Sequence, residues 1–269
     1  MTVLGDSNSS ENRDTFPAMT RILALHAHPD DIETLCAATL ALLAGQGHHI
    51  TIATATAGDC GSTETDNEIT ARIRKSEAAA AAKVIGADYL CVGIPDLCVF
   101  NDDATRRKVT ETIRAAQPEL VITASPADYH PDHEAVSALV RDACFAAPVK
   151  NYRTGDAKLL AEIPHLYFCD PIEGRDRDNN KVMAEFAVNV EGFFETKKKM
   201  LAAHQSQIAW VEKQHGIADY AGAMADWTKR RGRHFGVAYA EGFRQYRTHP
   251  YPASPLLQEL VRNALIKAP

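Results

Sequence analysis

Apolar and polar residues alternate in blocks along most of the chain, and the lengths of these blocks predict its elements. RILALHA (21–27) and HITIATATAG (49–58) are short apolar runs typical of buried strands, and DIETLCAATLALLAGQG (31–47) has helical length and spacing. This order predicts a β-α-β unit. The pattern continues as helix, strand, helix, strand and helix through EITARIRKSEAAAAAKVIG, YLCVGI, ATRRKVTETIRAAQ, LVITASP and HEAVSALVRDACFAA.

Strands that alternate with helices predict an α/β fold with a mostly parallel sheet and helices on both faces. Because the crossovers of such folds are right-handed, every strand-to-helix loop is expected at the same edge of the sheet. Ligands of these folds bind in the crevice outside the carboxyl ends of the strands. We therefore expect the functional residues in these loops.

The pattern changes after Lys150. HLYFCD and KVMAEFAVNV predict two further strands, KKKMLAAHQSQIAWVEKQHG predicts a long helix, and SPLLQELVRNALI predicts a last one. Since no linker interrupts the chain, residues 20–269 are expected to form a single domain. Residues 1–19 are polar and without periodicity, which predicts a mobile leader.

Composition and charge narrow the class of partner. The 269 residues are 45% hydrophobic and 24% charged, with a formal net charge of -6, which argues against a phosphate-driven nucleic-acid mode and favours a small molecule. No apolar run approaches the roughly 18–20 residues of a membrane span, and no secretory signal is recognisable. Six cysteines without CxxC spacing are typical of reduced thiols. Together these features predict a cytoplasmic protein that does not bind membranes.

Two similar words carry the candidate chemistry. HPDD (28–31) follows the first predicted strand, and HPDH (130–133) follows LVITASP, so both are expected at the same sheet edge. One such word is commonly a turn with a capping Asp, but two at equivalent strand ends favour a metal site. Catalytic zinc keeps about three protein ligands and an open position for water. Three of five residues could hold the metal, leaving two for proton transfer and charge stabilisation: His28, Asp30, Asp31, His130 and His133.

HAHPDDIE (26–33) and YHPDHEAV (129–136) resemble the two signature motifs of the PIG-L/LmbE-like family of zinc-dependent deacetylases. The resemblance extends to the R-x-x-E helix at Arg74, to IPD with Asp96, to AHQSQ with the lysines before it, and to YAEGFR. The chain departs from many relatives after DDIE, where it carries Thr, Cys and Ala in place of glycines.

The resemblance implies a Rossmann-like domain that hydrolyses the acetamide of an N-acetylglucosamine unit carried on another group. It also implies a role for each site residue. The metal, Zn²⁺ or another divalent ion, would be held by His28, Asp31 and His133. Asp30 would be the general base, His130 the oxyanion-side partner, and Arg74 and Asp96 the substrate contacts.

Two other functions are compatible with a Rossmann-like fold. A catalytically idle, metal-containing protein that binds a glycoconjugate would need neither Asp30 nor His130. A nucleotide-binding Rossmann protein would carry G-x-G-x-x-G or a P-loop after a strand, and neither motif occurs. The favoured partner is an amino-sugar conjugate, and the sequence leaves open whether the chain forms a homo-oligomer.

Single residues also have ordinary interpretations. Arg74 could pair with Glu77 on an exposed helix face, and Asp96 could merely cap a turn. The basic run 229–233 (KRRGR) is expected on the solvated surface, with a site for a phosphate or acidic aglycone as the alternative.

Overall fold

The structure, a computed structural model, describes residues 19–216 and 218–268. The predicted leader therefore lies, except for Met19, outside the described residues. The strands are β1 (Arg21–His26), β2 (His49–Thr56), β3 (Asp88–Ile94), β4 (Leu120–Thr123), β5 (His165–Cys169), β6 (Phe186–Asn189), β7 (Ala240–Tyr246) and β8 (Leu265–Lys267). The helices are α1 (Asp31–Leu35), α2 (Ala37–Gly45), α3 (Asn67–Lys83), α4 (Asp103–Ala116), α5 (Pro131–Ala146), α6 (Phe194–Leu201), α7 (Gln205–His215), α8 (Tyr220–Phe235) and α9 (Leu256–Val261).

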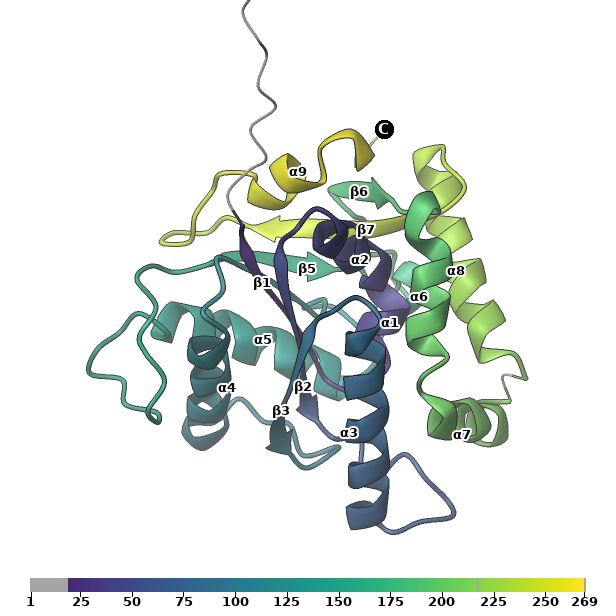
Figure 1. Cartoon of the computed structure of the whole chain (residues 1–269), viewed down its shortest axis with the longest axis horizontal. Helices are drawn as coiled ribbons and strands as arrows, with labels where there is room; N and C mark the ends of the chain where they lie inside the picture. Colours follow the sequence, from purple (N-terminus) through teal and green to yellow (C-terminus); the bar gives the residue numbers. More distant parts are fainter. Residues whose placement is uncertain (1–18, 217, 269) are drawn as a thin grey trace, which may run out of the picture.

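The strands form one eight-stranded sheet in the order β3-β2-β1-β4-β5-β7-β6-β8. The first five in this order are parallel, with Ile22 of β1 between Ile50 of β2 and Leu120 of β4. β7 pairs antiparallel with β5 and β6, and β8 pairs antiparallel with β6. The predicted α/β class with a mostly parallel sheet is confirmed (Figure 1).

Each face of the sheet buries its own apolar cluster. Leu23 and Leu25 of β1 pack on the side of α4 and α5, whereas Ile22 and Ala24 pack on the side of α1, α2, α3, α6 and α9. Successive side chains of a strand point to opposite faces, so an apolar run such as RILALH is what a strand covered on both sides requires. The central strands are thereby fixed, and their carboxyl ends present the loops that follow them.

The predicted helix over 31–47 is interrupted at Cys36, which adopts φ −142° and ψ 7° and separates α1 from α2. The start of α2 receives its cap from β7. Glu241 accepts hydrogen bonds from the backbone N–H groups of Ala38 (3.1 Å) and Thr39 (2.7 Å), from the Thr39 hydroxyl (2.6 Å) and from Lys197 Nζ (2.7 Å). Lys197 and Glu241 are each 1% exposed. The break is therefore stabilised by a buried ion pair that joins two late segments to the first helices.

The C-terminal predictions need four corrections. The predicted long helix over 197–216 is broken at residues 202–204, between α6 and α7. The predicted last helix over 254–266 ends at Val261, and Leu265–Lys267 instead add an edge strand to the sheet. The sequence pattern predicts neither helix α8 nor strand β7, since KRRGR is expected as solvated surface and YAEGFR is noted only for the family resemblance.

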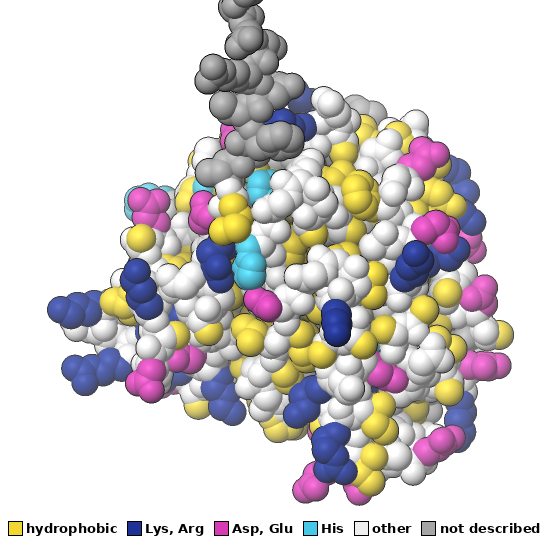
Figure 2. Space-filling view, in the orientation of Figure 1, with side chains coloured by type: hydrophobic (Ala, Val, Ile, Leu, Met, Phe, Trp, Pro, Cys, Tyr) yellow, Lys and Arg dark blue, Asp and Glu magenta, His cyan; other side chains and the backbone are white. Residues whose placement is uncertain are grey.

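Among the described residues, no helix combines the length and hydropathy that crossing a membrane would need. On the face of the molecule in Figure 2, basic and acidic side chains are interspersed and do not gather into a single basic stripe.

Candidate metal centre

The HPDD and HPDH words meet at the carboxyl edge of the sheet, as expected. β1 and β4 are neighbours, so the loop after His26 and the loop after Thr123 lie side by side. α1 begins at Asp31, and Asp30 before it has φ 93°, a left-handed conformation that non-glycine residues seldom adopt. α5 begins at Pro131, which suits the first helical position. Both helices thus start inside the crevice.

The three predicted ligands form a continuous chain of contacts. His28 Nδ1 lies 3.2 Å from Asp31 Oδ2, and Asp31 Oδ1 lies 3.3 Å from His133 Nε2. His26 Nδ1 also lies 2.7 Å from Asp31 Oδ2. All four residues are at most 9% exposed.

Several overlapping sets of three donors lie close enough to hold one cation. The sets are His28, His130 and His133; His26, Asp31 and His133; and His28, Asp96 and Asp132, with donor atoms within 4.8 Å of one another. His28 and His133 recur in these sets, and Asp31 joins His133 in one. The crevice therefore offers nitrogen and oxygen donors of the kinds that bind divalent metals, while the assignment of His28, Asp31 and His133 stays a prediction.

The electrostatics of these donors fit a cation. Burial alone would lower the pKa of His28, but Asp31 and the hydrogen bond with Asp132 hold this pKa well above its usual range. Burial would likewise lower the pKa of His133, but the charge of Asp31 and the hydrogen bond with Asp128 raise it above its usual value. The same negative field that retains these protons would favour a divalent ion, which displaces the protons when it binds.

The two adjacent aspartates have opposite tendencies. Burial would raise the pKa of Asp31, but His133, His26 and His28 hold it well below its usual range. For Asp30, burial dominates and raises the pKa, with Asp31 adding to the rise and Arg74 opposing it. Two carboxyl groups whose pKa values are driven apart are suited to different tasks. Asp31 suits a permanently charged ligand, and Asp30 suits a proton acceptor.

Arg74 is buried and does not form the exposed pair with Glu77 that the ordinary interpretation expected. Its Nη1 (NH1) donates to Gly58 O and its Nη2 (NH2) to Pro29 O, both at 2.8 Å, and Nη2 lies 3.5 Å from Asp30 Oδ1. A side chain at Gly58 would overlap the guanidinium. Arg74 therefore holds the loop that carries Asp30, and contact with substrate stays a prediction.

Asp96 lies in the turn after β3 and also contacts His28 of the candidate metal centre. Its Oδ1 accepts a hydrogen bond from Leu97 N at 3.0 Å and lies 3.1 Å from His28 Nε2, and its Oδ2 accepts from Cys60 N at 3.2 Å. Burial would raise the pKa of Asp96, but the hydrogen bond with His28 and the charge of His28 lower it below its usual value. Its role as a substrate contact also stays a prediction.

His130 caps α5 with its ring, because Nδ1 accepts a hydrogen bond from Asp132 N at 3.2 Å. The ring packs 4.8 Å from that of His28 and stacks 4.7 Å from that of His133, measured between centroids. Burial, His133 and His28 lower the pKa of His130. A neutral ring that accepts at Nδ1 carries its proton on Nε2, so His130 remains a hydrogen-bond donor.

Sequence reasoning missed two supporting residues, Asp128 and Tyr220, and gave a third, His204, only as part of the AHQSQ resemblance. Asp128 Oδ1 lies 3.1 Å from His133 Nδ1 and fixes that ring, and a carboxylate two residues before HPDH was an available signal. Tyr220 of α8 donates a hydrogen bond to Asp30 Oδ2 at 3.1 Å. His204 Nε2, fully buried, lies 3.5 Å from Glu33 Oε2. The last two contacts join segments far apart in the chain, so no local pattern predicts the partners of Tyr220 and His204.

The KRRGR run is only partly surface. Lys229 is exposed, but Arg231 is buried against Asp170 at the end of β5, so the expectation for the whole run is wrong at this position. Arg231 packs its guanidinium on the ring of Trp227 at 4.9 Å from the centroid, which accounts for its burial.

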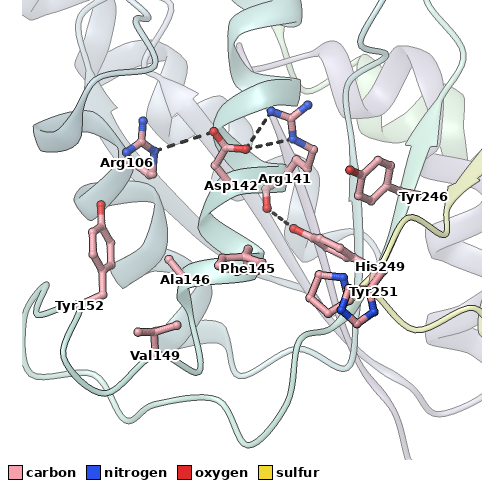
Figure 3. Close-up of a pocket in the computed structure, with 11 residues that line it drawn as sticks. Arg106, Arg141, Asp142, Phe145, Ala146, Val149, Tyr152, Tyr246, His249 and Tyr251 are labelled. Atoms are coloured by element: carbon pink, nitrogen blue, oxygen red, sulfur yellow. Dashed lines mark hydrogen bonds and ion pairs between the residues drawn. The ribbon is translucent and has the colours of Figure 1, made fainter.

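A separate pocket of about 450 Å³ lies between α4, α5 and the loop after β7 (Figure 3). Tyr246, His249 and Tyr251 line one side, and Phe145 and Tyr152 line the other. Its arginines are already paired with Asp142, and it contains none of the predicted site residues.

Comparisons with known proteins identify the family of this chain. The profile of the PIG-L family, described as GlcNAc-PI de-N-acetylase, matches residues 23–144. The chain is 31% identical over 157 residues to the uncharacterized deacetylase YaiS of Escherichia coli, covering 54% of this chain and 80% of YaiS. It is 28% identical to the probable N-acetyl-alpha-D-glucosaminyl L-malate deacetylase 2 of Bacillus cereus, covering 77% of this chain and 93% of the relative.

Solved structures share the fold. The crystal structure of GalB, the 4-carboxy-2-hydroxymuconate hydratase of Pseudomonas putida KT2440, matches with a TM-score of 0.70 and 22% identity, covering 88% of this chain and all of GalB. The fold thus serves more than one reaction. The donor set in the crevice and the match to a deacetylase family indicate a divalent metal ion there. The profile match, together with the 31% identity to YaiS over 80% of that relative, shows that the chain belongs to the PIG-L family, whose LmbE-like deacetylases its motifs resemble.

Proposed function

We propose that this protein is a metal-dependent N-deacetylase that removes the acetyl group, or another acyl group, from an N-acetylglucosamine-type conjugate. The observation that carries the proposal is the convergence of Asp30 and Asp31 with His130 and His133 in one buried crevice. The deacetylases among its relatives support the reaction, and the B. cereus relative supports an amino-sugar substrate. The free thiols of all six cysteines support a cytoplasmic location.

We assign the metal to His28, Asp31 and His133. Their imidazole and carboxylate donors, buried in a field that favours cations, suit zinc in particular. A zinc ion bound there would polarise the substrate carbonyl and lower the pKa of water to about 7. The remaining steps fall to side chains that are not ligands.

Asp30 acts as the general base. Its raised pKa makes it a better proton acceptor than an exposed aspartate, and its neighbour Asp31 keeps its own charge. Asp30 accepts a proton from the attacking water, and the same proton passes to the amine as the C–N bond breaks. His130 donates from Nε2 to the oxygen on which negative charge develops.

Arg74 and Asp96 orient the reaction partners. Arg74 holds the carbonyls of Pro29 and Gly58 and so keeps Asp30 in its left-handed conformation. Asp96 lies beside His28 at the crevice and can accept a hydrogen bond from a sugar hydroxyl.

The test is release of acetate from a panel of N-acetylglucosaminyl conjugates by metal-replete protein, with 4-carboxy-2-hydroxymuconate as a second arm. We expect acetate from at least one conjugate and no hydration of the second compound. Binding of a conjugate without release would favour the idle alternative. Hydration without acetate release would assign the activity of GalB instead.

A further inference from the structure

The carboxylate of Asp30 is held from a distant helix. Tyr220, at the start of α8, donates its hydroxyl hydrogen to Asp30 Oδ2 at 3.1 Å, and the same hydroxyl lies 3.4 Å from Thr34 Oγ1 of α1. Burial and the charge of Asp30 raise the pKa of Tyr220 well above its usual range, so the hydroxyl keeps its proton and acts as a donor.

The start of α8 is fixed by its own cap. Asp219 accepts a hydrogen bond from Gly222 N at 2.7 Å, which sets Tyr220 at the first helical position. Thr228, further along the helix, is also buried and bonds back to Met224 O at 2.9 Å. The ring of Tyr220 therefore approaches Asp30 from a helix whose first turn is anchored.

The other oxygen of Asp30 faces a competing partner. Oδ1 lies 3.5 Å from Arg74 NH2, longer than a good charge-assisted hydrogen bond of about 2.7–2.9 Å. Rotation of the carboxylate toward Arg74 would shorten this contact and turn an Asp30 oxygen away from the crevice. The hydrogen bond from Tyr220 opposes that rotation.

We propose that Tyr220 is a positioning residue for Asp30: it holds the carboxylate against the pull of Arg74, so that one oxygen stays available to the attacking water. This inference rests on the proposed deacetylase function. Tyr220 acts through Asp30 and not on the metal, since its hydroxyl contacts Asp30 and Thr34.

The test compares Tyr220→Phe with Tyr239→Phe, because each change removes one hydroxyl from a tyrosine near α8. Tyr239 stacks its ring on Phe194 at 3.8 Å between centroids and serves as the matched control. We expect Tyr220→Phe to lower kcat about tenfold, part of the 10²–10⁴ that a general base contributes. KM and metal content should stay within about twofold of the parent, and Tyr239→Phe should match the parent.

A double-mutant cycle separates positioning from a merely structural role. In an Asp30→Asn background, Tyr220→Phe should cost less than about twofold in kcat, because the base it positions is already gone. An equal loss in both backgrounds, an unchanged kcat in the single variant, or loss of metal would each overturn the inference.

Crystal structures of the parent and Tyr220→Phe provide a readout that needs no activity. We expect the carboxylate in the variant to turn so that an Asp30 oxygen lies about 2.8 Å from Arg74 NH2. If the parent releases no acetate, the proposed function fails, and this distance still decides the inference. An Asp30 carboxylate in the same place in both structures would overturn it.

Discussion

The two halves of the chain contribute differently to the same crevice. Every predicted site residue lies between residues 28 and 133, inside the segment that matches the family profile. Arg74 and Asp128 support the site from within this segment. Further support comes from beyond residue 144, where Tyr220 contacts Asp30, His204 contacts Glu33, and Ser206 contacts Glu77. Short words at strand ends therefore carry the reactive groups, and distant elements fix their orientation. Mutations in the first half should abolish chemistry, and mutations in the second should tune it.

The largest effect is expected from His133→Ala. His133 Nε2 faces Asp31, and Asp128 holds its other nitrogen, so the variant loses a ligand together with its support. Loss of a supporting group alone costs about 10–100-fold in metal affinity, and we expect loss of a ligand to exceed this. Metal analysis after dialysis against a mild chelator is the measurement, with the exposed His249→Ala as control. Full metal content in His133→Ala would refute the ligand assignment.

Asp30→Asn should come next. The variant keeps its shape and its contact with Tyr220 but loses a proton acceptor, so turnover should fall on the order of 10²–10⁴ with normal metal content. Steady-state kinetics and metal analysis on one preparation provide the measurement. Parental activity in Asp30→Asn would move the base role to another residue, with His130 as the next candidate.

Arg74→Ala and Asp96→Ala should each lower kcat/KM by about ten- to a hundredfold, the loss of one charge-assisted hydrogen bond. Metal content should not change. If Arg74 acts by holding the carbonyls of Pro29 and Gly58, kcat should fall more than KM rises, and Arg74→Lys should not restore it, since lysine lacks the planar fork. Parental rates, metal content and Tm in both variants would remove the pair from the site.

The smallest effect on activity is expected in the second half, at Asp170. Burial raises the pKa of Asp170 to about 6, against the opposing charges of Arg231 and Arg244. Since the folded pKa lies above the unfolded value of about 3.9, the protonated form stabilises the fold at low pH, and this contribution of about 3 kcal/mol is lost as pH rises through 6. Asp170→Asn should thus gain stability relative to the parent between about pH 4 and 7.

Thermal unfolding of both proteins across this pH range is the measurement, with acetate release at pH 7 as the check on activity. We expect the difference in Tm to grow with pH and then level off. A difference that does not vary with pH would show that Asp170 titrates alike in the folded and unfolded chains.

The parallel half of the fold could be predicted because its evidence is local. A strand covered on both faces, such as β1, must be an apolar run, and each helix from α3 to α5 has its own periodicity and its own ends. The break at Cys36 could not be predicted, since the carboxylate that stabilises it belongs to Glu241, about 200 positions away. Residues within the site differ in the same way. HPDD and HPDH predict ligands and a base, whereas no sequence pattern near Tyr220 indicates its contact with Asp30.

The ion pair between Lys197 and Glu241 also determines when, during synthesis of the chain, the start of α2 can receive its cap. The start of α2 emerges from the ribosome early, but the carboxylate that caps it follows about 200 residues later. At about 5–20 residues per second, that interval is at least about ten seconds. Throughout it, the helix that follows the HPDD word lacks its permanent partner, so the crevice can reach its final form only near the end of translation. A nascent chain released at residue 144, where the family match ends, would carry all the predicted ligands on an incomplete scaffold.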